Sequence, residues 1–355
     1  MLDIAKLCLK YIPMNGYTLT SLSRRVRLRR AVLSVSRLLY CVMQYLLAQF
    51  MRLKVLHLNA SRRIYREQIT LYCNTPEINR YIAQLNQNGF VQFDNFLSAE
   101  DCDDIRSQMD FNFNRLNINR GGYISERFPN LHGLEIAQLA KIGERISVKN
   151  PFLNIDGFAE IAFDERLLKV VARYLEGIPI ASYSADRSFV LNKFLESAGW
   201  HRDTFTTRRL NVFIYLNDVT AHRGPLYYLS KSHNAKFKSF RPLYNWEQDI
   251  NSEEGRIQED EMLKFYSKSD MQKFLVPKGT AVIADVSGYH KGPIWTDTTD
   301  PKNNFRDAIA MSFVTSSFKA EANVNIGSRN NVISRQQYRQ MTDFQRLFTK
   351  HFNIR

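Results

Sequence analysis

The sequence predicts an α+β fold in which helices flank a core of short strands. Helical spacing of apolar residues dominates from about residue 75 to 175, whereas β-branched segments bounded by glycine or proline dominate from about 179 to 314. A His-x-Asp tripeptide, His201-Arg202-Asp203, stands among these strands. A chain of 355 residues is long enough to bury a sizeable core.

The helices of the first half have recognisable starts. Thr75 is a suitable N-cap for a helix over Thr75–Asn86, with Pro76 in its first turn and Gly89 after its end. Ser98-Ala99-Glu100-Asp101 has the outline of a capping box and should begin a helix that runs to about Phe113. After a Gly- and Asn-rich loop over 114–133, further helices are expected over Leu134–Glu144 and Phe158–Leu175.

The strands are recognised by apolar, β-branched segments that end at turn residues. They are expected over Val91–Asn95, Pro179–Phe194, Arg209–Asn217, Gly224–Leu229, Lys278–Asp285 and Arg306–Val314. A charged and aromatic insertion at about 234–273 interrupts them and has helical character over Glu253–Tyr266. Two readings of this insertion remain: a lid or substrate wall, or a solvated surface segment.

The His-x-Asp tripeptide has the residue types of a metal site. Side chains alternate along a strand, so His201 and Asp203 should face the same way. A histidine and a carboxylate on one face, with a second histidine from elsewhere, form the set that holds non-haem Fe(II). Taken alone, the tripeptide also fits a hydrogen-bonded His–Asp pair at a strand end.

An ordered series of motifs resembles the phytanoyl-CoA dioxygenase family of Fe(II)/2-oxoglutarate oxygenases. The matching segments are Asn88–Ser98, Leu191-Asn192-Lys193 before the tripeptide, Gly224-Pro225-Leu226 through Ser232-His233, and the single residues His290 and Arg306. Ser230-Lys231 stands where the family has Pro-Gly, so that turn should differ. The matches cover most of the chain after residue 80.

The resemblance implies a double-stranded β-helix (jelly-roll or cupin-like) core and a full set of cofactors. Fe(II) would be held by His201, Asp203 and His290, and Arg306 would bind the distal carboxylate of the cosubstrate 2-oxoglutarate, with O2 as the oxidant. The candidates for lining the cosubstrate pocket or approaching the metal are Tyr215, Phe189, Leu191 and Thr204.

The implied reaction is the hydroxylation of a small-molecule or lipid-like substrate, with release of succinate and CO2. Related halogenases have a small residue where this chain has Asp203, so the carboxylate favours hydroxylation. Two alternatives remain open: a catalytically inactive jelly-roll binding protein, and a membrane-associated adaptor whose N-terminal region is the active part.

The basic charge of the chain is concentrated at its N-terminus. Residues 1–70 contain thirteen Lys or Arg and two acids, which leaves only +3 of the net +14 for the rest. Nucleic-acid binding is therefore not expected, because such proteins spread basic residues over the folded domain. Four scattered cysteines without C-x-x-C spacing argue against a zinc site and favour a reducing compartment, the cytoplasm.

One long amphipathic helix is expected from about Leu22 to about Leu56. Its apolar stripe consists of Leu39, Met43, Leu46, Phe50 and Leu53. The stripe fits packing against the catalytic domain, peripheral contact with a membrane surface, or a spanning or cleaved targeting segment. The expected regions are a basic helical extension over 1–70, the dioxygenase domain over 75–320 and a partly helical tail over 321–355.

Overall fold

The computed structural model describes most of the chain after residue 66. The described residues are 67, 69–114, 145–148, 150–189, 199–203, 208–234, 257, 259–264, 266–292, 305–314, 331–349 and 352–355. They all belong to the second of two compact units, which spans Ser61–Arg355. The predicted helices over 22–56 and Leu134–Glu144 lie outside the described residues.

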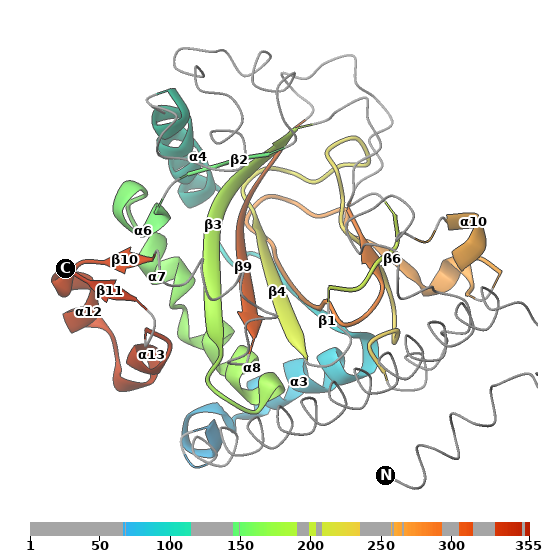
Figure 1. Ribbon diagram of the computed structural model, residues 1–355, viewed down its shortest axis with the longest axis horizontal. Coiled ribbons are helices and arrows are strands. Elements are labelled where there is room, and N and C mark those ends of the chain that lie inside the picture. Colours follow the sequence, from blue (N-terminus) through green and yellow to red (C-terminus); the bar gives the residue numbers. More distant parts are fainter. Residues whose placement is uncertain are drawn as a thin grey trace, which may run out of the picture. The chain divides into compact units, whose positions relative to one another are not determined.

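The larger of the two main sheets has six antiparallel strands and forms the body of the domain (Figure 1). In spatial order they are β1 (Phe90–Phe93), β7 (Ala281–Asp285), β4 (Arg209–Tyr215), β9 (Phe305–Val314), β3 (Ile180–Phe189) and β2 (Arg145–Ser147). The strands predicted near residues 91, 180, 209, 281 and 306 are all present in this sheet. Since β7, β4, β9 and β3 are far apart in sequence order, the sheet is held by long-range pairing.

The smaller sheet has three antiparallel strands, in the order β6, β5 and β8. Their bounds are Met271–Lys273, Tyr227–Leu229 and His290–Lys291. Isolated bridges continue the same pattern from His290 to His201 and from Trp200 to Ile257. Strand β6 lies within the stretch that the sequence marked as an insertion.

The caps read from the sequence define the first helices. Helix α3 (Pro76–Asn88) begins at Thr75, whose hydroxyl accepts a hydrogen bond from the Ile78 N–H, and it ends at Gly89 with φ of 87°. Helix α4 (Ala99–Asn114) begins at the predicted capping box, where Ser98 and Asp101 exchange side-chain to backbone hydrogen bonds. Both predicted helices are confirmed.

The helix predicted over Phe158–Leu175 is wrong in one respect, because it is two helices. They are α7 (Phe158–Ala162) and α8 (Glu165–Leu175), and a short helix α6 (Pro151–Asn154) precedes them. The break lies at Asp164, whose carboxylate accepts the Leu167 N–H at 2.8 Å and thereby caps α8. An Asp that caps a helix competes with continuation of the preceding one.

The two faces of the larger sheet have different roles. On β4, Leu210, Val212 and Ile214 are fully buried in the main core together with α3, α4 and α8, whereas Arg209 and Asn211 on the opposite face are half-buried. We call this opposite face of β3, β4 and β9 the inner face. The alternation follows the two-residue period of a strand. One face of the sheet therefore packs against the helices, and the other carries polar side chains.

The C-terminal residues add a small subdomain to the same core. Helices α12 (Arg335–Gln340) and α13 (Asp343–Leu347) both start with reciprocal capping boxes, and the strands β10 (Val332–Ile333) and β11 (Asn353–Ile354) pair in parallel beside them. Phe344 is buried in the main core, so this part of the chain is integral to the domain. The remaining short elements are α10 (Glu259–Met262) and a 3₁₀ turn (Lys268–Asp270). Across the described stretches, no helix combines the length and the apolar character that a bilayer crossing requires.

Candidate metal centre

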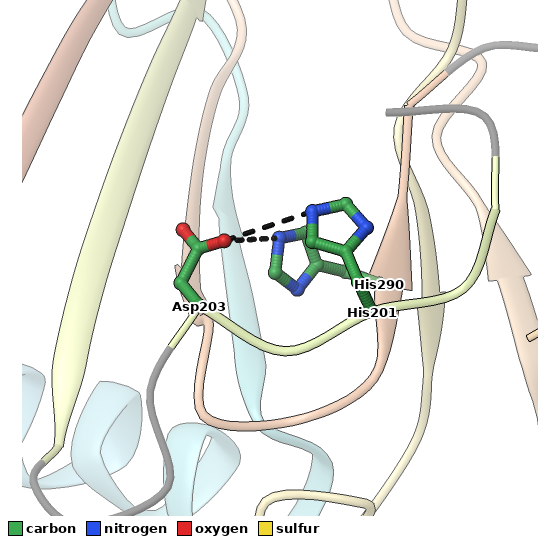
Figure 2. A group of neighbouring side chains, drawn as sticks. All are labelled: His201, Asp203 and His290. Atoms are coloured by element: carbon green, nitrogen blue, oxygen red, sulfur yellow. Dashed lines mark ion pairs between the residues drawn. The ribbon is translucent and has the colours of Figure 1, made fainter. Parts of the chain in front are cut away.

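The structure brings His201, Asp203 and His290 together. The Nε2 atoms of both histidines lie 3.6 Å from the same carboxylate oxygen, Oδ1 of Asp203 (Figure 2). One ligand atom from each residue lies within 4.8 Å of the other two. Within the described residues, no other trio of His, Cys, Asp or Glu converges in this way.

Backbone pairing produces this convergence across 89 positions of sequence. His201 and His290 face each other in an antiparallel bridge, and each N–H donates to the other's carbonyl at 2.9 Å. The chain bends after Arg202, and the Asp203 N–H donates to the Val286 carbonyl at 2.9 Å. The histidine rings therefore leave the smaller sheet side by side, with centroids 4.3 Å apart, and the carboxylate meets them from the bend.

The other ring nitrogen of each histidine is held by a backbone carbonyl. His201 Nδ1 lies 2.9 Å from the Gly199 carbonyl, and His290 Nδ1 lies 3.1 Å from the Gly288 carbonyl. A carbonyl can only accept, so Nδ1 carries a hydrogen, and Nε2, which lies nearer Asp203, is the nitrogen that can bind a metal. This tautomer is the one that a metal-ligating histidine needs.

The second oxygen of Asp203 is held by the inner face. Asn211 Nδ2 donates to Asp203 Oδ2 at 3.4 Å, and Arg209 Nη1 lies 4.0 Å from the same oxygen. Ser312 links these two side chains, because it donates to Asn211 Oδ1 at 2.7 Å and accepts from Arg209 Nε at 2.8 Å. No motif in the sequence marks these three residues as part of a site, although the alternation of Arg209–Tyr215 places Arg209 and Asn211 on one face.

The distances suit a divalent metal. Bonds from His or carboxylate to such an ion are about 2.0–2.2 Å, so two ligands of one ion lie at most about 4.4 Å apart. Both 3.6 Å separations fall within that limit. All three donors are of the borderline-to-hard type that Fe(II) accepts, and a set of three leaves further coordination positions for other ligands.

Arg306 lies on the inner face at the start of β9. Its guanidinium donates to the Gly224 carbonyl and lies 5.9 Å from the centre of the Tyr215 ring. Gly224 is four residues before Tyr228, which pairs directly with His290 in the smaller sheet. Arg306 therefore lies on the same face of the larger sheet as Ser312 and Asn211, towards the opposite end of β9 from Ser312.

Tyr215 is a buried neighbour of Arg306. Burial raises the pKa of its hydroxyl, and the charge of Arg306 acts in the opposite direction. The hydroxyl has no hydrogen-bond partner among the described residues. Opposite Tyr215 and Phe213 in the register stand the small residues Ala308 and Ala310. A buried phenol without a partner is a hydrogen-bond donor available to a ligand.

The remaining sequence candidates are placed only in part. Phe189 is the last residue of β3, while Leu191 and Thr204 lie outside the described residues. His233 is buried near the end of α3, with Nε2 3.1 Å from the Asn86 carbonyl. This contact links the turn after β5 to the end of α3, which is a structural role.

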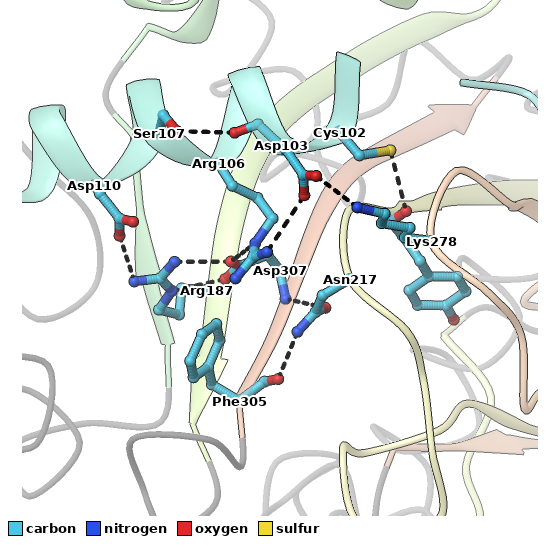
Figure 3. A network of polar contacts seen from close by, with 11 residues as sticks. Cys102, Asp103, Arg106, Ser107, Asp110, Arg187, Asn217, Lys278, Phe305 and Asp307 are labelled. Atoms are coloured by element: carbon cyan, nitrogen blue, oxygen red, sulfur yellow. Dashed lines mark hydrogen bonds and ion pairs between the residues drawn. The ribbon is translucent and has the colours of Figure 1, made fainter. Parts of the chain in front are cut away.

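A buried ion-pair network fixes the strand that carries Arg306 (Figure 3). Asp307 points to the opposite face, where Arg187 contacts both of its oxygens at 2.7 Å and Arg106 contacts Oδ2 at 3.0 Å. Asn217 accepts from the Asp307 N–H and donates to the Phe305 carbonyl. Asp307 therefore forms its ion pairs with Arg187 and Arg106, and not with its sequence neighbour Arg306.

The chain matches one family model and several solved structures. Residues 85–294 match the family model described as Phytanoyl-CoA dioxygenase (PhyH). No sequence among the curated proteins matches.

Three solved structures illustrate the structural similarity. The non-heme alpha ketoglutarate dependent carbocyclase SnoK from nogalamycin biosynthesis is 14% identical, with 66% of this chain and 83% of that chain covered and a TM-score of 0.43. EctD from S. alaskensis with bound Fe is 14% identical, with coverage of 66% and 76% and a TM-score of 0.44. EvdO2 from Micromonospora carbonacea var. aurantiaca complexed with 2-oxoglutarate is 17% identical, with coverage of 66% and 90% and a TM-score of 0.41.

Proposed function

Because the chain belongs to the phytanoyl-CoA dioxygenase family, we propose that it is an Fe(II)- and 2-oxoglutarate-dependent dioxygenase. The observation that carries the proposal is the convergence of His201, Asp203 and His290, each with one ligand atom close to those of the other two. The cofactors are Fe(II), 2-oxoglutarate as cosubstrate, and O2. An inactive binding protein or a membrane adaptor would have no use for this convergence.

The order of strands supports a double-stranded β-helix as the core. Along the chain, β3, β4, β7 and β9 enter the larger sheet, and the 200–201 segment, β5, β6 and β8 enter the smaller one. In space they are ordered β7-β4-β9-β3 in one sheet and β6-β5-β8-His201 in the other. This interleaving of eight strands is what we infer to be the jelly-roll arrangement.

Each residue of the site has a role in the proposed reaction. The Nε2 atoms of His201 and His290 and Oδ1 of Asp203 would hold the metal, while Asn211 and Arg209 keep the other oxygen of Asp203 turned away. The chemistry that Fe(II) supplies when bound is the coupling of O2 reduction to oxidation of 2-oxoglutarate and of a second substrate. A carboxylate at Asp203, rather than a small residue, supports hydroxylation as the outcome.

Arg306 is the proposed anchor of the cosubstrate. A guanidinium can bind the distal carboxylate of 2-oxoglutarate through two parallel hydrogen bonds. The nearby Tyr215 hydroxyl would donate a further hydrogen bond to the same molecule. Both residues lie on the inner face, so the cosubstrate would extend along it from the metal towards the start of β9.

The inner face favours a polar small-molecule substrate over a plain acyl chain. Ser182 stands opposite Ser312 in the register of β3 and β9, and Ser184 follows on the same face. All three side chains are half-buried, so this surface beside Asn211 is polar, although Ser312 already bonds Asn211 and Arg209 and Ser184 already donates to Asp186. Contact of the basic extension with a membrane remains a separate proposal. It is tested by salt-sensitive binding to anionic vesicles that is lost when residues 1–56 are deleted.

The test of the function uses purified protein, Fe(II) and 2-oxoglutarate in air. We expect succinate formation, even uncoupled from a substrate, that is abolished in His201→Ala and in His290→Ala. His222→Ala, an exposed histidine outside the site, is the matched control and should retain full turnover. Undiminished succinate formation in both site variants would overturn the assignment. An anaerobic titration of Fe(II) with 2-oxoglutarate, followed by visible absorption, separates cosubstrate binding from turnover.

A further inference from the structure

A second layer of side chains lies behind the two histidines. Trp200 and Lys291 are the sequence neighbours of His201 and His290, and strand alternation turns them to the opposite side of the smaller sheet. Both are 1% exposed. The Lys291 ammonium lies 5.1 Å from the Trp200 ring centre and 4.7 Å from that of Tyr227, and it forms an ion pair with Glu259.

The ion pair joins the site to the segment around α10. Ile257 and Trp200 exchange backbone hydrogen bonds of 2.9 and 3.0 Å. Met262 is 1% exposed and packs in one cluster with Trp200, Leu229 and Tyr289. Ile257 and Met262, which belong to the predicted insertion, therefore pack on the back of the strands that carry the metal ligands.

The strands that carry the two histidines are short, so the side-chain contacts behind them add to the backbone pairing that holds them. Strand β8 contains only His290 and Lys291, and the facing 200–201 segment is attached through isolated bridges. A buried ammonium is retained only where it is paired, so Lys291 can leave its position only at considerable cost. The position of Lys291 therefore restricts the backbone that sets the spacing of the two Nε2 atoms.

We propose that Lys291, together with Glu259, is a positioning residue for the metal site and raises its affinity for a divalent cation. This inference rests on the proposed function, because it assumes that His201, Asp203 and His290 bind metal. Neither side chain touches the metal or the substrate. Their effect is on the distance and orientation of the two histidines. Groups hydrogen-bonded directly to metal ligands typically change metal affinity about 10- to 100-fold, and for these more indirect contacts we expect the lower end of that range.

The experiment measures Co(II) affinity of the full-length protein by titration calorimetry and by the visible absorption of the bound ion. Lys291→Ala and Glu259→Gln should each weaken Co(II) binding about tenfold and alter the absorption spectrum. Lys291→Arg, which keeps the charge and the stacking on the rings, should restore affinity to within about threefold of the wild type. Glu259 is half-exposed, so Glu259→Gln gives a folded variant if Lys291→Ala does not.

Lys273→Ala is the matched control. Lys273 also places its ammonium on the Tyr227 ring, at 5.3 Å, but it lies on β6, away from the histidines. It should leave Co(II) affinity unchanged. A purely structural role for Lys291 would lower the urea midpoint of the apo-protein without changing affinity or spectrum, and that result would overturn the inference. If the wild type binds Co(II) no better than His201→Ala does, the proposed function fails as well.

Discussion

Replacing Arg187 by methionine tests the ion-pair network that secures β9. The Arg187 side chain is 1% exposed and that of Asp307 is fully buried, and two hydrogen bonds of 2.7 Å join them. Burial opposes the charge of Arg187, but the hydrogen bonds and charges of Asp307 and Asp110 outweigh it and raise its pKa. Arg187 is therefore cationic throughout the accessible pH range.

The magnitude follows from what the substitution leaves behind. Hydrogen bonds to charged groups contribute about 1.5–3 kcal/mol each, and removing one member of a buried pair costs about 3–5 kcal/mol. Asp307 retains Arg106 at 3.0 Å, which partly neutralises its charge. The methionine also loses the stacking of the guanidinium on the Phe305 ring, 4.3 Å from its centre. We therefore expect a loss of about 3 kcal/mol in the free energy of unfolding.

Urea unfolding followed by far-UV circular dichroism measures this loss, with the slope m compared to exclude a changed denatured state. Asp110→Asn is the control, because the Asp110 side chain is 47% exposed and its contact with Arg187 should contribute at most about 1 kcal/mol. The double variant Arg187→Met/Asp307→Leu should regain much of the loss, since an apolar pair can replace a buried ion pair. A loss below about 1 kcal/mol in Arg187→Met would refute the reasoning.

Three further outcomes are expected. Gly89→Ala should cost at least about 1 kcal/mol more than Gly157→Ala in urea unfolding, because both have positive φ but only at Gly89 would the new Cβ lie 2.3 Å from another side-chain atom. Equal losses would contradict this. Burial raises the pKa of Cys73 and Cys102 to about 11, so at pH 8 iodoacetamide should label them about 100-fold more slowly than in urea, as mapped by mass spectrometry. The stability that these protonated thiols contribute is complete below about pH 9 and is lost as the pH rises towards 11; fast native labelling would exclude this. Arg306→Gln should raise the KM for 2-oxoglutarate about 10- to 100-fold with Fe(II) affinity unchanged, and an unaltered KM would remove Arg306 from the cosubstrate site.

Local signals predicted the elements well where the forces are local. Thr75 and Gly89 bound α3, and Ser98 with Asp101 starts α4, because capping joins groups only a few residues apart. The same rule explains the failure over Phe158–Leu175. Asp164 looked like one more residue of a helix, but its carboxylate caps α8 and ends α7. Both outcomes were compatible with the local pattern.

The sequence could not show which polar side chains contact one another in the interior. Arg187 and Asp307 are 120 positions apart, and Lys291 and Glu259 come from a strand and from a stretch interpreted as an insertion. Asn211 stood out from its neighbours only as a polar residue in an apolar strand. Its role depends on Ser312, which the register of β4 with β9 places directly opposite.

By itself, the sequence determined the class of chemistry and the order of the elements, because residue types and their spacing along a strand are local properties. The sequence identified His201, Asp203 and His290 as candidate metal ligands, but it did not give the distances between their ligand atoms. Only the tertiary structure decided that two histidines 89 positions apart face each other in one bridge, with both Nε2 atoms 3.6 Å from one carboxylate oxygen. The reason is that strand register is set by burying side chains from distant segments against one another, and no segment contains that information alone.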